Sequence, residues 1–207
     1  LYPFVYVLAA SFSSADAVIT GKVLYYPVEF TLESYKRVLS EEGVWIAYGN
    51  TVYYTLVGTF VNILFTILGA YPLSKKRVMG RAALNFFIAF TLLFNAGMIP
   101  TYLNIKELGL LNTRASLIFA FAVSTWLVIL LRTFFQSIPE EMEEAAKVDG
   151  ASDALILWKI YLPLSVPALA TLSLFYAVSR WNSYFWAMVL LRDDDKIPLQ
   201  VLLKKLI

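Results

Sequence analysis

Residues 47–70 read AYGNTVYYTLVGTFVNILFTILGA, without a single charged side chain. As an α-helix this run would be about 36 Å long, enough to cross a hydrocarbon layer of about 30 Å with some tilt. Four further apolar runs lie elsewhere in the chain, at 1–10, 82–99, 115–131 and 164–191. Only Arg180 interrupts the last of them. The five runs together predict a bundle of membrane-spanning helices.

The composition of the whole chain supports lipid as its surroundings. Hydrophobic residues make up 59% of the 207 residues and charged residues only 15%, with a mean hydropathy of +0.67. Soluble domains carry about 25% charged residues, so the composition argues against an ordinary soluble enzyme. The chain has neither Cys nor His, which rules out disulfides, Cys/His zinc sites and His-based triads. We predict no catalytic residue and no metal site. The net charge of +2 says little about partners, and no basic arm suggests a nucleic-acid partner.

The first run is interpreted as the end of a truncated span, and a sixth span is expected to begin near Pro198-Leu199. The predicted fold is therefore all-α, a polytopic bundle of about six spans that forms one domain over 1–207.

The orientation in the membrane follows from a basic cluster without an acid, formed by Lys75, Lys76, Arg77 and Arg81. Such a cluster favours the cytoplasmic side. This orientation places 136–160 inside as well. The segments expected at the outer face are 11–46, 100–114 and 181–198.

Polar residues are rare within the predicted spans. None of these spans contains an acidic residue, whereas transporters driven by protons or sodium commonly carry one. The absence leaves two readings, a passive channel or scaffold and a transporter energised by a separate subunit. Amides do occur, at Asn50, Asn62 and Asn95, where each forms either a helix–helix hydrogen bond or a solute contact.

The stretch 180–186 places a cation, an amide and four aromatic residues near the outer end of the fifth span. Aromatic faces and hydrogen-bonding groups suit a sugar-like solute. The alternative is an aromatic belt at the lipid headgroups with an Arg that reaches the interface. The candidate substrate pathway consists of Arg180, Trp181, Asn182, Tyr184 and Asn95.

The segment 136–163 predicts two short helices on the cytoplasmic side. Ser137 and Glu140 have capping-box spacing, and Gly150 is expected to stop the first helix in a left-handed conformation. Helical periodicity places Met142, Ala145, Ala146 and Asp149 on one face. A second amphipathic stretch follows at 153–162. The pair is either a docking element for another protein or an interfacial helix pair on the headgroups.

This segment resembles the EAA signature of permeases from binding-protein-dependent ABC importers. The matching residues are Glu144, Ala145, Ala146, Asp149, Gly150, Ala151, Ile160, Leu162 and Pro163. The segments 30–35, 109–113, 134–139 and 181–182 resemble the carbohydrate branch, specifically its smaller permease. The segments 94–100 and 198–200 resemble a branch linked to oligo- or polysaccharide uptake.

The resemblance implies the ABC importer permease fold and a multi-pass protein of the cytoplasmic membrane of a prokaryote. The partners implied are a second, homologous permease, two ATP-binding subunits docked on the 136–163 loop and an extracytoplasmic solute-binding protein. This chain would bind no cofactor, since ATP and Mg belong to the ATP-binding subunits. Its only Gly-Lys pair is followed by Val23, so a phosphate-binding loop is missing. The implied function is carbohydrate import by alternating access, not enzymatic catalysis. The alternatives are an import permease for another solute and a passive channel or scaffold.

Overall fold

The structure is a computed structural model that describes residues 1–94 and 96–206. The described chain is helical, with turns and irregular segments between the helices. In chain order the elements are α1 (Tyr2–Ser11), α2 (Ala15–Ile19), α3 (Glu33–Ser40), α4 (Glu42–Ser74), α5 (Arg81–Leu93), α6 (Met98–Glu107), α7 (Arg114–Phe119), α8 (Thr125–Gln136), α9 (Glu140–Val148), α10 (Asp153–Ile156), the π-helical η1 (Leu157–Tyr161), α11 (Leu162–Leu164), α12 (Val166–Trp181), α13 (Tyr184–Leu190) and α14 (Leu199–Leu206). The predicted all-α class is confirmed.

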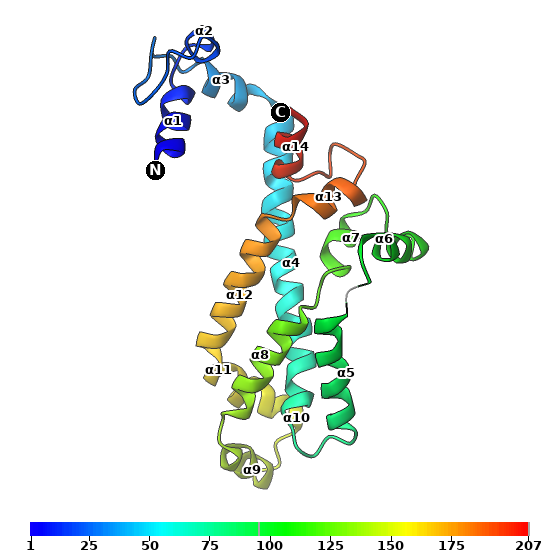
Figure 1. The fold of residues 1–207 in the computed structure, drawn as a ribbon. Helices are drawn as coiled ribbons and strands as arrows, with labels where there is room; N and C mark the ends of the chain where they lie inside the picture. The colour runs from blue at the N-terminus through cyan, green and yellow to red at the C-terminus, as the bar shows by residue number, and fades with distance from the viewer. Residues whose placement is uncertain (95, 207) are drawn as a thin grey trace.

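Helix α4 is the central element of the fold. It has 33 residues and contains the whole of the 47–70 run. Helices α8 and α12 pack along it, and α7 and α14 contact its N-terminal half (Figure 1). Within the described chain, α4 is the one unbroken helix whose length and composition suit a membrane crossing.

Three of the four further apolar runs are not continuous helices, contrary to the sequence prediction. The 82–99 run breaks between α5 and α6, whose axes differ by 119°, and the 115–131 run breaks between α7 and α8. The 164–191 run breaks between α12 and α13. Hydropathy reports how apolar a segment is, not whether its backbone continues as one helix. If each bent helix pair is counted as one span, up to three candidate spans result, so the count of six stays a prediction.

The loops gather at two opposite ends of the elongated bundle. Figure 1 shows α9 beside the α4–α5 connection at one end, while α6, α7, α13 and α14 lie toward the other. Helices α2 and α3 also lie toward that second end. The structure therefore groups the loops as the charge pattern predicts, with 75–81 and 136–160 together.

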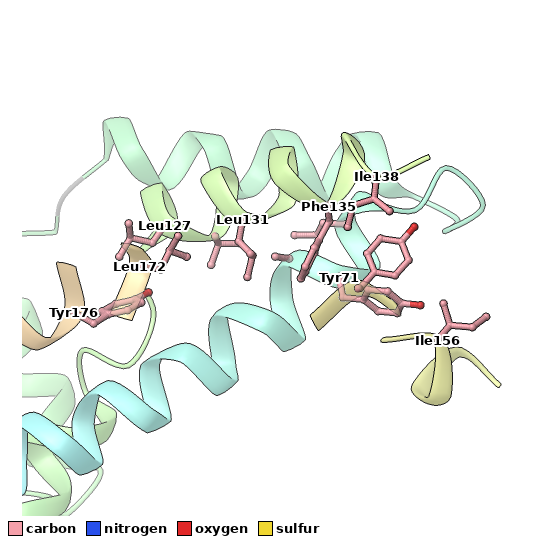
Figure 2. Packing of buried hydrophobic residues seen from close by; sticks show 12 residues of the cluster. Tyr71, Leu127, Leu131, Phe135, Ile138, Ile156, Leu172 and Tyr176 are labelled. Atoms are coloured by element: carbon pink, nitrogen blue, oxygen red, sulfur yellow. The ribbon is translucent and has the colours of Figure 1, made fainter. Parts of the chain in front are cut away.

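The buried apolar core at the α9 end joins helices that are distant in sequence. Tyr71 from α4, Phe135 from α8 and Tyr161 from η1 meet edge to face, with ring centroids 5.3 to 6.2 Å apart (Figure 2). Ile138 and Ile156 complete this end of the cluster. The core therefore holds the 136–163 loop firmly against α4 and α8.

Candidate functional site

Helix α9 begins directly after Pro139, and its first turn carries Glu140, Glu141 and Glu143. Acidic side chains are favourable there because the helix dipole is positive at its N-terminus. The predicted capping box is wrong. The Ser137 hydroxyl instead donates to the Phe134 carbonyl at 2.7 Å, the same carbonyl at the end of α8 that accepts from the Ser137 N–H at 3.0 Å.

Helix α9 ends in a Schellman motif, as the position of Gly150 predicts. The Gly150 N–H donates to the Lys147 carbonyl at 3.0 Å, and the Ala151 N–H donates to the Ala146 carbonyl at 2.9 Å. Gly150 has φ +79°, a backbone conformation that residues with a Cβ rarely adopt. The glycine therefore fixes where α9 stops and α10 can begin.

The two alanines of α9 do not share the outward face, contrary to prediction. Ala146 packs against the buried core around Tyr71, Phe135 and Tyr161 (the aromatic core cluster). Ala145, in contrast, is exposed. Met142 and Val148 are 42% and 88% exposed. Helix α9 therefore has an inner face bound to the bundle and a free outer face with small, apolar and acidic residues.

Glu143 fixes the inner face of α9 to the bundle. Its carboxylate accepts from Lys75 Nζ at 2.5 Å and from the Tyr161 hydroxyl at 3.0 Å. Arg77 and Lys147 donate to the other carboxylate oxygen at 2.6 and 2.5 Å. The Glu143 side chain is only 9% exposed. One carboxylate thus joins the α4–α5 loop, α9 and η1.

Lys75 lies in an unusual environment at the end of α4. Its Nζ lies 3.4 Å from the Tyr161 ring centroid and 4.5 Å from that of Tyr71. Burial lowers the pKa of Lys75 below its ordinary value, while the hydrogen bond to Glu143 opposes that shift. The rings and the carboxylate together stabilise a buried ammonium.

Two further ion pairs connect the basic cluster to the 136–163 loop. Arg77 also donates to the Asp153 carboxylate at the start of α10. Lys76 lies 2.7 Å from the exposed Glu140 and lowers the pKa of that carboxyl. The 75–81 cluster, which the sequence marks only as a sign of orientation, therefore holds both α9 and α10.

Sequence reasoning missed Glu143, Lys75, Arg77 and Tyr161 as site residues. It named the neighbouring Glu144, which is exposed. A usable signal was present, since an acidic helix and a basic cluster were both assigned to the cytoplasmic side. Pairing them would have predicted ion pairs, although it could not have chosen among the four glutamates.

The other motif residues divide in the same way between the two faces of the loop. Ala151, Ile160 and Leu162 pack against the aromatic core cluster, whereas Asp149 and Pro163 are exposed. After α11 the chain bends by 81° into α12. The motif thus holds the loop in place and presents an outer surface.

The residues of the candidate substrate pathway do not converge. Trp181 and Tyr184 are 39% and 44% exposed, and the Asn182 amide donates to Val178 of its own helix. Arg180 points into the bundle and donates to Asn62 at 2.7 Å. Asn95 lies outside the described residues.

The two described amides of α4 are hydrogen-bonded within the chain. Asn62 accepts from Arg180 of α12, which is the predicted helix–helix bond. Asn50 donates to the Asp195 and Ile197 carbonyls and accepts from Arg114. Asn50 therefore holds the loop before α14. Among the described residues it makes no hydrogen bond to a neighbouring long helix, in contrast to Asn62.

The family model described as "Binding-protein-dependent transport system inner membrane component" matches residues 43–202. The polygalacturonan/rhamnogalacturonan transport system permease protein YtcP of Bacillus subtilis is 43% identical over 99% of this chain and 72% of its own length. The arabinooligosaccharides transport system permease protein AraQ of Halalkalibacterium halodurans is 28% identical over 97% of this chain and 74% of its own length. A crystal structure of a bacterial ABC transporter involved in the import of the acidic polysaccharide alginate contains a similar chain. It is 51% identical with a TM-score of 0.95, and the match covers 99% of this chain and 73% of that one.

Proposed function

The chain belongs to the inner membrane components of binding-protein-dependent transport systems, and on this premise we propose that it is the permease subunit of an ATP-driven carbohydrate importer. A member of this family is a transport subunit of a membrane complex and not an enzyme. The match over residues 43–202 carries the proposal, because it includes residues 43–74 of the central helix α4 and the whole 136–163 loop.

Carbohydrate is the solute class that the relatives support. The names of three of them refer to polygalacturonan or rhamnogalacturonan, arabinooligosaccharides and alginate. The composition of those solutes differs, yet all are saccharides. An oligo- or polysaccharide fragment is therefore the proposed cargo of this chain.

The proposed energy source is ATP hydrolysis by two partner subunits that dock on the outer face of α9. That face carries Glu141, Glu144 and Asp149 beside the small Ala145, and all four are exposed. Acidic side chains around a small residue suit a close approach by a basic groove. No cofactor is assigned to this chain, and ATP with Mg would belong to the partners.

A movement of α9 would reach the bundle by two routes. Glu143 joins α9 to Lys75 at the end of α4, and Arg77 joins the same carboxylate to Asp153 of α10. Because α10 continues through η1 and α11 into α12, a movement of α9 would shift the nearest ends of α4 and α12 together. This coupling would drive alternating access.

We also propose where this chain lies and with which proteins it assembles. We place the chain in the cytoplasmic (inner) membrane of a prokaryote as a multi-pass, single-domain permease over 1–207, with the coupling loop at 136–163. A second, homologous permease would pair with it. An extracytoplasmic solute-binding protein would dock at the opposite end from α9.

Gly150→Val tests the coupling function. Val at φ +79° is strained by about 1–2 kcal/mol or more, and no neighbouring atom lies within 4 Å of the added Cβ. The substitution should therefore redirect the end of α9 without a clash in the bundle. We expect normal assembly with the second permease, but loss of the stimulation of ATP hydrolysis by solute-loaded binding protein in reconstituted complex.

Gly80→Val is the matched control. Gly80 has φ +73° and also has open space around its Cβ position, but it precedes α5 and lies outside α9. The Val variant carries the same kind of strain and should retain most of the stimulation. Normal stimulation in the Gly150 variant would remove the coupling function and favour the channel or scaffold alternative.

A further inference from the structure

Arg180 of α12 is a partly buried cation without a carboxylate partner. Its guanidinium donates to the Leu117 carbonyl, to the Asn62 amide oxygen at 2.7 Å and to the Ile118 and Phe121 carbonyls at 3.2 and 2.8 Å. All four acceptors are uncharged. None of the ion pairs found among residues 1–94 and 96–206 includes Arg180.

The arrangement has a clear structural cause. Leu117 and Ile118 lie in the last turn of α7, and Phe121 follows it before α8 begins. Carbonyls at the end of a helix lack partners within that helix, and such backbone at membrane depth is tolerated only when protein or a water-filled cavity satisfies it. Gly58 of α4 makes room for this contact, since a Cβ there would lie 3.0 Å from Arg180 Nε.

A cavity of about 380 Å³ adjoins this helix break. Phe121 and Trp186 line it, with ring centroids 4.9 Å apart. Ser124, Ser179, Arg180 and Ser183 also line it. Its volume is in the range of small-molecule sites. Broken helices beside a binding cavity are known from the solute sites of secondary transporters.

We propose that this cavity is the solute subsite that this chain contributes, and that Arg180 selects sugars that carry a carboxylate. The inference rests on the proposed carbohydrate function and narrows it to acidic saccharides. Neutral acceptors bind the two terminal nitrogens of Arg180 but leave its full positive charge in place. That charge faces a cavity whose aromatic and hydroxyl lining suits a sugar ring, and a uronate would neutralise it. The exposed Trp181 and Tyr184 have no part in this subsite.

The first test measures the electrostatic potential of the cavity through Ser183→Cys. The chain has no other Cys, so labelling is measured on this chain after it is separated from its purified complex. The probes are an anionic and a cationic methanethiosulfonate of similar size, with rates divided by those at Ser34→Cys on exposed α3. We expect the anionic reagent to be favoured about tenfold. Arg180→Lys should keep this preference and Arg180→Gln should remove it.

The second test measures protection of the same Cys by sugar. The complex in nanodiscs, with its binding protein and ATP, is labelled in the presence of a galacturonate trimer or the same trimer with its carboxyls reduced to alcohols. We expect the acidic trimer to slow labelling at least fivefold and the neutral trimer to leave it unchanged. Equal protection by both trimers, or no preference for the anionic reagent, would overturn the selection by charge.

Uptake by the same complex in proteoliposomes separates this inference from the proposed function. If saccharides are taken up but none protects Ser183→Cys, the cavity is not the subsite and the importer function stands. If a panel of acidic and neutral oligosaccharides gives no ATP-dependent uptake, the proposed carbohydrate function itself is wrong.

Discussion

Lys75 and Arg180 are both cations held against α4, but their surroundings differ. Lys75 faces a carboxylate at 2.5 Å and two aromatic rings, so its charge is paired within the chain. Arg180 donates to three carbonyls and one amide oxygen, so it has hydrogen-bond partners but no counter-charge among the described residues. The paired charge links α4 to α9. The unpaired charge remains available to a solute.

The largest effect is expected for Glu143→Gln. The change removes the carboxylate from a buried pair and leaves the Lys75 ammonium without its counter-charge. Breaking a buried pair in this way costs about 3–5 kcal/mol. We expect the free energy of unfolding in mixed micelles to fall by this amount. Glu144→Gln is the control, because Glu144 is exposed and should change stability by less than about 0.5 kcal/mol. Equal effects in the two variants would contradict the anchoring role of Glu143.

A smaller effect is expected for Arg180→Lys. Lysine keeps the charge but lacks the planar fork that reaches several acceptors at once. The carbonyls at the end of α7 would lose some of their donors, at a cost of about 1–3 kcal/mol. The same unfolding measurement checks this, with the exposed Arg192→Lys as the control. A cost below that of the control would mean that the helix break is stable without the guanidinium.

The smallest effect is a pH dependence that reports on Lys75. Burial already lowers its pKa in the folded state, and Glu143→Gln removes the group that opposes this shift. Between the lowered pKa and the ordinary value of 10.5, the unfolded chain binds more protons than the folded one. The free energy of unfolding must then rise with pH in that window. Below the window the cost of the buried charge is fully present.

We therefore expect the free energy of unfolding to rise more between pH 7.5 and 9.5 for Glu143→Gln than for the wild type. Unfolding curves of both proteins at both pH values measure this difference. Adding Lys75→Met should abolish the difference, because the titrating ammonium is then absent. A rise that persists in the double variant would come from another group and would remove Lys75 from the account.

Local features of the sequence predicted part of this structure well. The charge-free 47–70 run lies within α4, and Gly150 ends α9 as expected. Both depend on residues close together in the chain, where hydropathy and backbone preference act directly. The two-ended grouping of the loops followed from one basic cluster by the same kind of reasoning.

The missed features depend on contacts between distant residues. The break between α7 and α8 is tolerated because Arg180 satisfies its carbonyls from some 60 positions away. Helix α9 is held by Glu143 because Lys75 lies opposite it, 68 positions earlier in the chain. Neither pairing leaves a periodic signal within one segment, so a single sequence does not identify which residues pair, even where opposite charges predict that two segments meet.

The central claim is that α9 binds the bundle with one face and an ATP-binding subunit with the other. Ala145 and Ala146 are adjacent, yet the first is exposed and the second packs against the core. In this Cys-free chain, a single Cys at either position can carry a benzophenone maleimide for photo-cross-linking in the assembled complex. Ala145→Cys should cross-link to an ATP-binding subunit and Ala146→Cys should cross-link within the permease. Cross-linking of the ATP-binding subunit from Ala146→Cys but not from Ala145→Cys would contradict the account.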